Sequence, residues 1–222
     1  MGRFEKWEID TALERKEFRA LYKPVFSADE RIIGADIKLQ WDNPEYGLLE
    51  EAWFSNHIAL MGQWQAFFDW ICQQARPLWE LMETRLGTVF LTLHLPPQAQ
   101  PASAPNWLYA IAPDYKTAKQ LHENGMGIVI EQPLWQQKAE ESIEAKEIIL
   151  TEPHLLNLWQ HPHSHIAQWL KADAAPLRAA RLKDKQSLAL AKKAGCKHFE
   201  LPQTQEYFEA KVLETFLPEE II

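Results

Sequence analysis

Two apolar runs near the N-terminus decide the fold class: LYKPVFS at residues 21–27 and RIIGADIKLQW at residues 31–41. In the second run, Ile37, Leu39 and Trp41 alternate with polar residues, which is the period of a strand with one buried face. Residues 28–30 form a turn that is too short for a crossover, so the two strands are predicted to be antiparallel neighbours.

The rest of the chain alternates between predicted strands and predicted helices. Strands are predicted over 88–95, 128–131, 147–151, 168–173, 177–182 and 197–201. Helices are predicted over 11–17, 114–124, 134–145, 154–160, 184–194 and 204–216, with two more inside 50–86. This alternation is typical of parallel βαβ units, and about eight strands predict an α/β fold of the (β/α) barrel type.

The length constrains this barrel. The chain has 222 residues, whereas a complete (β/α) barrel typically needs roughly 250. We therefore expect one domain over residues 1–222, a modified TIM-like barrel that is trimmed of one or two helices.

Charge and hydropathy exclude several classes of protein. The net charge is −8, from 23 Lys and Arg against 31 Asp and Glu, which argues against a nucleic-acid binder. The sequence has no apolar run of about 18 residues, so no membrane association is expected. Residues 1–8 lack the apolar region of a secretory signal, so we expect a cytoplasmic protein, with Cys72 and Cys196 as buried free thiols.

Two compositional features each allow two interpretations. Five of the ten tryptophans lie between Trp41 and Trp79. They either fill the core or form a surface that binds a partner protein. The tract HPHSH at residues 161–165 is either an exposed loop or a metal-binding segment.

The two N-terminal runs also carry a resemblance to a known family. Residues 17–25, EFRALYKPV, and 33–41, IGADIKLQW, resemble EFxLYYQP and IxGAEALLRW, the opening of EAL domains. These are bacterial cyclic di-GMP phosphodiesterases and their inactive relatives. Later segments are similar to the family's VSVNLSP, LELE, DxLKID and EEQLALLRALGC motifs, at residues 91–97, 128–131, 168–173 and 186–196. In the family, the DDFG strand lies between the LELE and DxLKID strands. The resemblance implies a TIM-like barrel of EAL type with an antiparallel first strand.

The resemblance also implies a reaction and a set of metal ligands. EAL phosphodiesterases hydrolyse one phosphodiester bond with two divalent cations, usually Mg²⁺ or Mn²⁺. Three ligand positions of the family correspond here to Asp36, His94 and Glu131. Asp36 is shorter than the family's Glu, and His94 replaces an amide oxygen with an imidazole, which suits transition metals better than Mg²⁺.

Other positions that the family needs for catalysis are lost. The aspartates of the DDFG motif fall on Leu150 and Thr151, and the glutamate of the AEGVE motif falls at about Ala179. Lys171 matches the catalytic lysine and Asp173 is kept, so these two residues are catalytic remnants. We therefore expect low metal occupancy and no cofactor, with Mg²⁺ or Mn²⁺ bound only if residual activity exists.

Two alternatives stay open for the metal positions. Asp36, His94 and Glu131 either converge as a facial triad for a transition metal or are remnant polar residues at strand ends. A slip in the alignment after residue 131 would place Glu147 or Glu152 at a ligand position and restore part of the chemistry.

The residues that would hold the substrate have changed as well. The phosphate-binding arginine after the name motif is Gln40, the leucine of that motif is Lys38, and the glutamine of YQP is Lys23. An amide in place of a guanidinium loses charge and bidentate geometry. Lys23, Lys38, Gln40 and Lys171 are the candidate ligand-binding residues.

These observations lead to three hypotheses. The first is a catalytically inactive EAL-like regulatory domain in bacterial cyclic di-GMP-related signalling that acts by binding a protein partner. The second is a sensor that binds cyclic di-GMP without hydrolysing it. The third is a residual metal-dependent phosphodiesterase. Because family members often dimerise, a homodimer is a further expectation from the resemblance.

Overall fold

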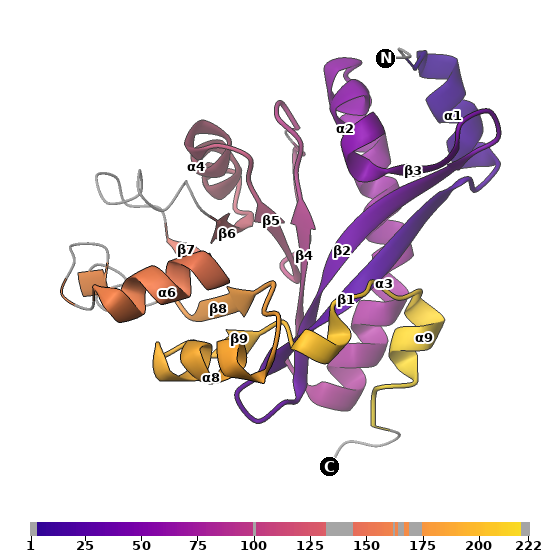
Figure 1. Ribbon diagram of the computed structural model, residues 1–222. Helices are drawn as coiled ribbons and strands as arrows, with labels where there is room; N and C mark the ends of the chain where they lie inside the picture. The colour runs from indigo at the N-terminus through magenta and orange to yellow at the C-terminus, as the bar shows by residue number, and fades with distance from the viewer. Residues whose placement is uncertain are drawn as a thin grey trace.

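The computed structural model describes residues 4–99, 101–131, 144–161, 163, 167–168 and 175–218 (Figure 1). The strands are β1 (Phe18–Ser27), β2 (Ile32–Asn43), β3 (Gly47–Glu50), β4 (Phe90–His94), β5 (Leu108–Ile111), β6 (Gly127–Glu131), β7 (Ala145–Thr151), β8 (Leu177–Ala180) and β9 (His198–Phe199). The helices are α1 (Lys6–Glu14), α2 (Glu51–Leu60), α3 (Trp64–Leu86), α4 (Tyr115–Glu123), α6 (Glu152–Gln160), α8 (Lys185–Lys193), α9 (Ala210–Glu214) and the 3₁₀ turn η1 (Pro202–Thr204).

The sheet closes on itself. Its strand order is β1-β9-β8-β7-β6-β5-β4-β2-β3, and a further pairing of β1 with β2 completes the ring. Because β3 lies outside this ring, it extends β2 as a hairpin and leaves eight strands in the barrel. The predicted α/β barrel is therefore confirmed.

The first strand is antiparallel to both of its neighbours, as predicted. β1 pairs antiparallel with β2, with Lys23 opposite Asp36, and antiparallel with β9, with Phe26 opposite Phe199. The pairings of β2 with β4 and onward to β9 are parallel. The connection over residues 28–30 is a turn, which forces the direction of β1 to reverse.

One barrel strand is missing from the sequence prediction. β5 pairs in parallel with β4 and β6, yet residues 108–111 were assigned to no element. The run is only four residues long, LYAI, and it follows a loop rich in Pro, Ala, Gln and Ser. A short apolar run without alternation has no periodic signal, so only its place in the barrel identifies it as a strand.

The predicted strand over 168–173 is wrong at its start and has no place between its expected neighbours. Gln168 is helical, and β7 pairs directly with β8, with Leu150 opposite Ala179. Residues 169–174 lie outside the described residues. Of the predicted helix over 134–145, residues 134–143 also lie outside, and Ala145 is the first residue of β7.

Both terminal helices differ from the prediction. The first begins earlier, at Lys6 rather than near Thr11, because Glu5 and Glu8 form a reciprocal capping box. The predicted helix over 204–216 is confined to α9, since η1 and an extended segment precede it. Phe208 in that segment exchanges backbone hydrogen bonds with Tyr22 of β1.

The tryptophans divide between the core and the surface. Trp41 and Trp64 are buried, and Trp41 packs against Phe18 with 5.0 Å between ring centroids. Trp7 and Trp53 are exposed by 67% and 52%. The tryptophans therefore include both core residues and surface residues.

The remaining sequence predictions have mixed outcomes. Both cysteines are free; Cys196 is buried, whereas Cys72 is only partly buried. Within the tract 161–165, His161 and His163 are described, and both are exposed. Among the described residues, no helix combines the length and apolar character needed to cross a bilayer.

Candidate functional site

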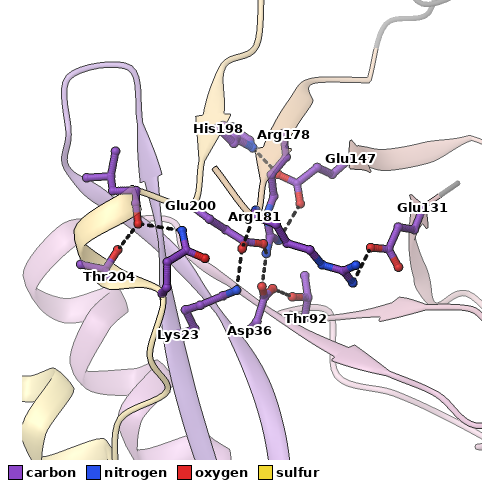
Figure 2. Close-up of polar contacts among 12 residues, drawn as sticks. Lys23, Asp36, Thr92, Glu131, Glu147, Arg178, Arg181, His198, Glu200 and Thr204 are labelled. Carbon is purple, nitrogen blue, oxygen red and sulfur yellow. Dashed lines mark hydrogen bonds and ion pairs between the residues drawn. The ribbon is translucent and has the colours of Figure 1, made fainter. Parts of the chain in front are cut away.

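A buried arginine on β8 lies among three carboxylates (Figure 2). The Arg178 side chain has no exposed surface, and its guanidinium contacts three carboxylates. Nη1 donates to Oε2 of Glu147 at 3.1 Å, and Nη2 donates to Oε1 of Glu200 at 3.2 Å. Nη2 also donates to Oδ2 of Asp36. These four residues, with Lys23, Thr92 and His198, form what we call the barrel cluster.

Strand alternation directs Arg178 into the barrel. Arg178 and Ala180 share one face of β8, and Ala180 packs with Ile111, Val129 and Ile149 in a small apolar cluster. Glu147 lies two residues before Ile149 and therefore on the same face of β7. The inward faces of four strands thus carry both the charges and the apolar residues beside them.

Further polar contacts complete the barrel cluster. Lys23 Nζ lies 2.5 Å from Oε2 of Glu200, and Nδ1 of His198 lies 2.5 Å from Oε1 of Glu147. Thr92 donates from Oγ1 to Oδ1 of Asp36. The three carboxylates therefore face the Arg178 guanidinium, the Lys23 amino group and the His198 imidazole.

Arg178 remains charged in this environment. Burial by itself lowers the pKa of the guanidinium, but Asp36, Glu147 and Glu200 outweigh that effect and raise the pKa above its ordinary value. A buried cation that is paired with carboxylates on several sides is held by both charge and hydrogen bonds. The Arg178 guanidinium therefore keeps its positive charge inside the barrel, among the three carboxylates.

Tyr207 covers the barrel cluster on the side of β1. Its ring lies beneath two ammonium groups, 5.1 Å from Lys23 Nζ and 5.3 Å from Lys38 Nζ. Burial raises the pKa of the Tyr207 phenol, and the nearby charges of Asp36 and Glu200 raise it further. A neutral phenol ring thus lies against the lysines that were predicted to bind phosphate.

The structure shows where the predicted ligand-binding residues lie. Lys38 forms an ion pair with Glu50, with 2.6 Å from Nζ to Oε2, and Gln40 donates to Oε1 of the same residue at 2.9 Å. The Lys38 pair lowers the pKa of Glu50, which therefore remains a carboxylate. Lys171 and Asp173 lie outside the described residues. The three described candidates therefore all contact Glu50 or Glu200.

The predicted metal positions do not form one site. Asp36 contacts Arg178 and Thr92 through its two oxygens, while Glu131 lies 3.4 Å from the Arg181 guanidinium. His94 ends β4, two residues beyond the partner of Asp36 in register. Among the described residues, no three His, Cys, Asp or Glu side chains are grouped to hold a metal ion. These residues do not fit the family's pair of divalent cations.

The two alternative metal positions also have other contacts. Glu147 pairs with Arg178 and His198, and Glu152 lies 3.3 Å from Lys183 Nζ. Glu152 also accepts a hydrogen bond from Ser187. Glu147 and Asp36 thus meet at the Arg178 guanidinium, whereas Glu152 pairs with Lys183 and Ser187 instead.

Sequence reasoning missed Arg178, His198 and Glu200, and it named Glu147 only as an alternative. A signal was present at one of these positions, because Arg178 is the one charged residue in the otherwise apolar β8 (LRAA). A lone charge in a buried strand needs a partner. Nothing in the linear sequence showed that the partners of Arg178 lie 142, 31 and 22 residues away.

Solved structures of EAL domains share this fold. The EAL enzyme Bd1971 in its cAMP- and cyclic-di-GMP-bound form matches with a TM-score of 0.72 at 13% identity, covering 96% of this chain and 68% of that chain. The PaMucR phosphodiesterase complex with c-di-GMP matches with a TM-score of 0.64 at 16% identity, covering 93% and 98%. The c-di-GMP-bound FimX EAL domain from Pseudomonas aeruginosa gives 0.65 at 18%, covering 91% and 95%. No protein-family model and no curated protein sequence matches the chain. The chain therefore has the fold of an EAL domain.

The strand order changes two correspondences drawn from the resemblance. Because β5 intervenes, β6 is the fifth barrel strand along the chain and β7 is the sixth. β5 directly follows β4, the strand that is similar to VSVNLSP, so β5 takes the place of the LELE strand in the order of the motifs. By the same order, Glu131 on β6 takes the place of the DDFG strand, and Leu150 and Thr151 on β7 take the place of the DxLKID strand. Strand order therefore does not place Leu150 and Thr151 at the positions of the DDFG aspartates.

Proposed function

We propose that this chain is a catalytically inactive EAL-fold domain that regulates bacterial cyclic di-GMP-related signalling by binding another protein. The single observation that carries the proposal is the ion pair between Arg178 and Asp36. Asp36 is the position that corresponds to the family's first metal ligand. In this chain its carboxylate is neutralised from inside the barrel.

The chemical argument concerns the charge at that position. Metal-assisted hydrolysis needs carboxylate oxygens that are open to a hard divalent cation. Arg178 places a buried, permanent positive charge against the same carboxylate, and it binds Glu147 and Glu200 as well. A divalent cation at Asp36 would have to displace or approach this guanidinium, which repels it strongly at low dielectric.

The first test is a hydrolysis assay. The purified chain is incubated with cyclic di-GMP and Mg²⁺ or Mn²⁺, and the linear product is measured by chromatography, with the PaMucR phosphodiesterase as a positive control. We expect no turnover above the buffer rate. Metal-dependent turnover that disappears in Asp36→Asn would contradict the proposal.

A surface on α2 supports the partner-binding part of the proposal. Trp53, His57 and Leu60 are spaced four and three residues apart, which places them on one face of the helix. Trp53 and Leu60 are exposed by 52% and 65%. Exposed aromatic and apolar side chains on one helix face are typical of protein-binding sites.

The partner test compares two exposed tryptophans. Trp53→Ser combined with Leu60→Ser should abolish capture of a partner that binds the unmodified chain in a purified two-component assay. Trp159→Ser on α6 is the matched control, because Trp159 is exposed by 57% on another helix. If the α2 double variant and Trp159→Ser lost partner binding equally, α2 would not be the binding surface.

The alternative function is a cyclic di-GMP sensor. It is favoured by the c-di-GMP-bound structures of the PaMucR phosphodiesterase and the FimX EAL domain, which share this fold. Against it, Lys23 and Lys38 are paired with carboxylates and lie over Tyr207. Titration calorimetry with cyclic di-GMP and Mg²⁺ or Ca²⁺ separates the two functions: micromolar binding supports the sensor, and the absence of heat supports the partner-binding domain.

A further inference from the structure

A pocket outside the barrel cluster lies next to β1. The pocket has a volume of about 610 Å³ and is bounded by β1, the β1–β2 turn, the C-terminal end of α3, η1 and the segment after α9. Figure 1 shows the β1–β2 turn and the last described residues at the same end of the molecule. The volume lies within the range of small-molecule sites, about 300–1,000 Å³.

Two arginines give this pocket a positive charge. Arg31 and Arg85 both line it, and neither guanidinium has a hydrogen bond or an ion pair with any residue in the described part of the chain. The carboxylate of the lining, Glu30, lies 3.7 Å from Lys192 Nζ and is thereby offset. The described lining therefore has a net positive charge in a chain of net charge −8, and such a lining attracts an anion.

The remaining walls are largely apolar. They include Phe26, Ile32, Leu86, Leu201 and Phe216. A guanidinium binds carboxylate, sulfonate or phosphate oxygens through paired N–H groups, and apolar walls bury the body of the same molecule. We propose that this pocket binds a small organic anion, with its acidic group at Arg31 and Arg85 and its apolar body against these walls.

The pocket shares its wall with the barrel cluster. Pro24 and Leu201 both line the pocket. Lys23 immediately precedes Pro24 in the sequence, and Glu200 immediately precedes Leu201. Lys23 and Glu200 form the 2.5 Å ion pair inside the barrel. A bound anion therefore touches the residues next to both members of that pair, on the opposite side of the wall. This inference does not depend on the proposed function of the barrel.

A pair of dyes tests the proposal. 1-Anilinonaphthalene-8-sulfonate carries a sulfonate on an aromatic body, and N-phenyl-1-naphthylamine has the same aromatic body without a charge. Fluorescence titration of the full chain should show saturable binding of the sulfonate, at least tenfold tighter than binding of the neutral dye. The double variant Arg31→Gln, Arg85→Gln should bind the sulfonate at least tenfold more weakly and leave the neutral dye unchanged.

Arg76→Gln provides the matched control. Arg76 is an exposed arginine on α3 that does not line the pocket, so its variant should bind both dyes as the unmodified chain does. Near-ultraviolet circular dichroism of each variant shows whether tertiary packing is kept. Equal affinity for the two dyes, or unchanged sulfonate affinity in a folded double variant, would overturn the proposal.

Discussion

Arg178 on β8 donates a hydrogen bond to Asp36 on β2, and both side chains are buried inside the barrel. The two residues are separated by 142 positions in the sequence. Asp36 corresponds to a metal ligand in the family that the sequence resembles. In this structure a protein cation contacts the carboxylate, and the same cation also contacts Glu147 and Glu200.

Removing the guanidinium should destabilise the fold strongly. Arg178→Met would leave the buried carboxylates of Asp36, Glu147 and Glu200 without their main cation. Breaking a buried ion pair in this way typically costs about 3–5 kcal/mol. Urea unfolding measures the cost, and Arg181→Met is the control, because its side chain is 68% exposed and its pair with Glu131 is worth at most about 1 kcal/mol. Equal effects of the two substitutions would show that the barrel cluster does not stabilise the fold.

Divalent cations should not stabilise the protein. A cation that binds only the folded state raises the melting temperature with increasing concentration. Since Asp36 is occupied by Arg178 and Thr92, millimolar Mg²⁺ or Mn²⁺ should leave the melting temperature unchanged, in the unmodified chain and in Asp36→Asn alike. A concentration-dependent rise that Asp36→Asn removes would show that the cation binds at Asp36.

Glu51 should make the stability depend on pH. Burial raises its pKa from 4.5 to about 7, an effect that the hydrogen bond from the Leu39 backbone N–H only partly offsets. Because the folded-state pKa of Glu51 lies above its unfolded-state pKa, the contribution of Glu51 to the free energy of unfolding is most favourable below about pH 4.5. This contribution is lost as the pH rises toward 7. The loss is on the order of 3 kcal/mol.

The measurement compares Glu51→Gln with the unmodified chain in urea unfolding from pH 4.5 to 8. The amide keeps an acceptor for the Leu39 N–H but has no charge. The free energy of unfolding of Glu51→Gln should therefore rise relative to that of the unmodified chain up to about pH 7, and the difference should be constant above that pH. Glu83→Gln on the exposed side of α3 is the control. A constant difference between Glu51→Gln and the unmodified chain across the whole range would contradict the prediction.

Gly34 should not tolerate a side chain. A Cβ at this position of β2 would lie 2.5 Å from the backbone oxygen of Phe90 on β4, and a backbone atom in a barrel strand moves little. Gly34→Ala should cost about 1–3 kcal/mol through overpacking. At Gly127 the Cβ would meet the Tyr109 ring instead, and because a side chain shifts more easily than a backbone oxygen in a barrel strand, Gly127→Ala should cost less. Chemical unfolding of both variants decides the order.

Local patterns in the sequence predicted most of the framework. The alternation of Ile37, Leu39 and Trp41 and the short turn before Ile32 predicted the antiparallel first pair, which the structure confirms. Asp114 and Asp184 cap α4 and α8 at the predicted starts, each accepting a backbone N–H three residues on. These features depend on neighbours within a few residues, which is why the linear sequence contains them.

The candidate site required the tertiary structure. β5 has no periodic signal of its own, and its position shifts the strand count so that Glu131 lies on the fifth barrel strand. The sequence also placed Asp36 among metal ligands and did not connect it with Arg178. The sequence alone determined the alternation of strands and helices, the reversed first strand and the capped starts of α4 and α8, because each follows from contacts within a short segment. Barrel closure decided the rest: it brings the inward faces of β2, β7, β8 and β9 together, and only then does Arg178 meet its three carboxylates.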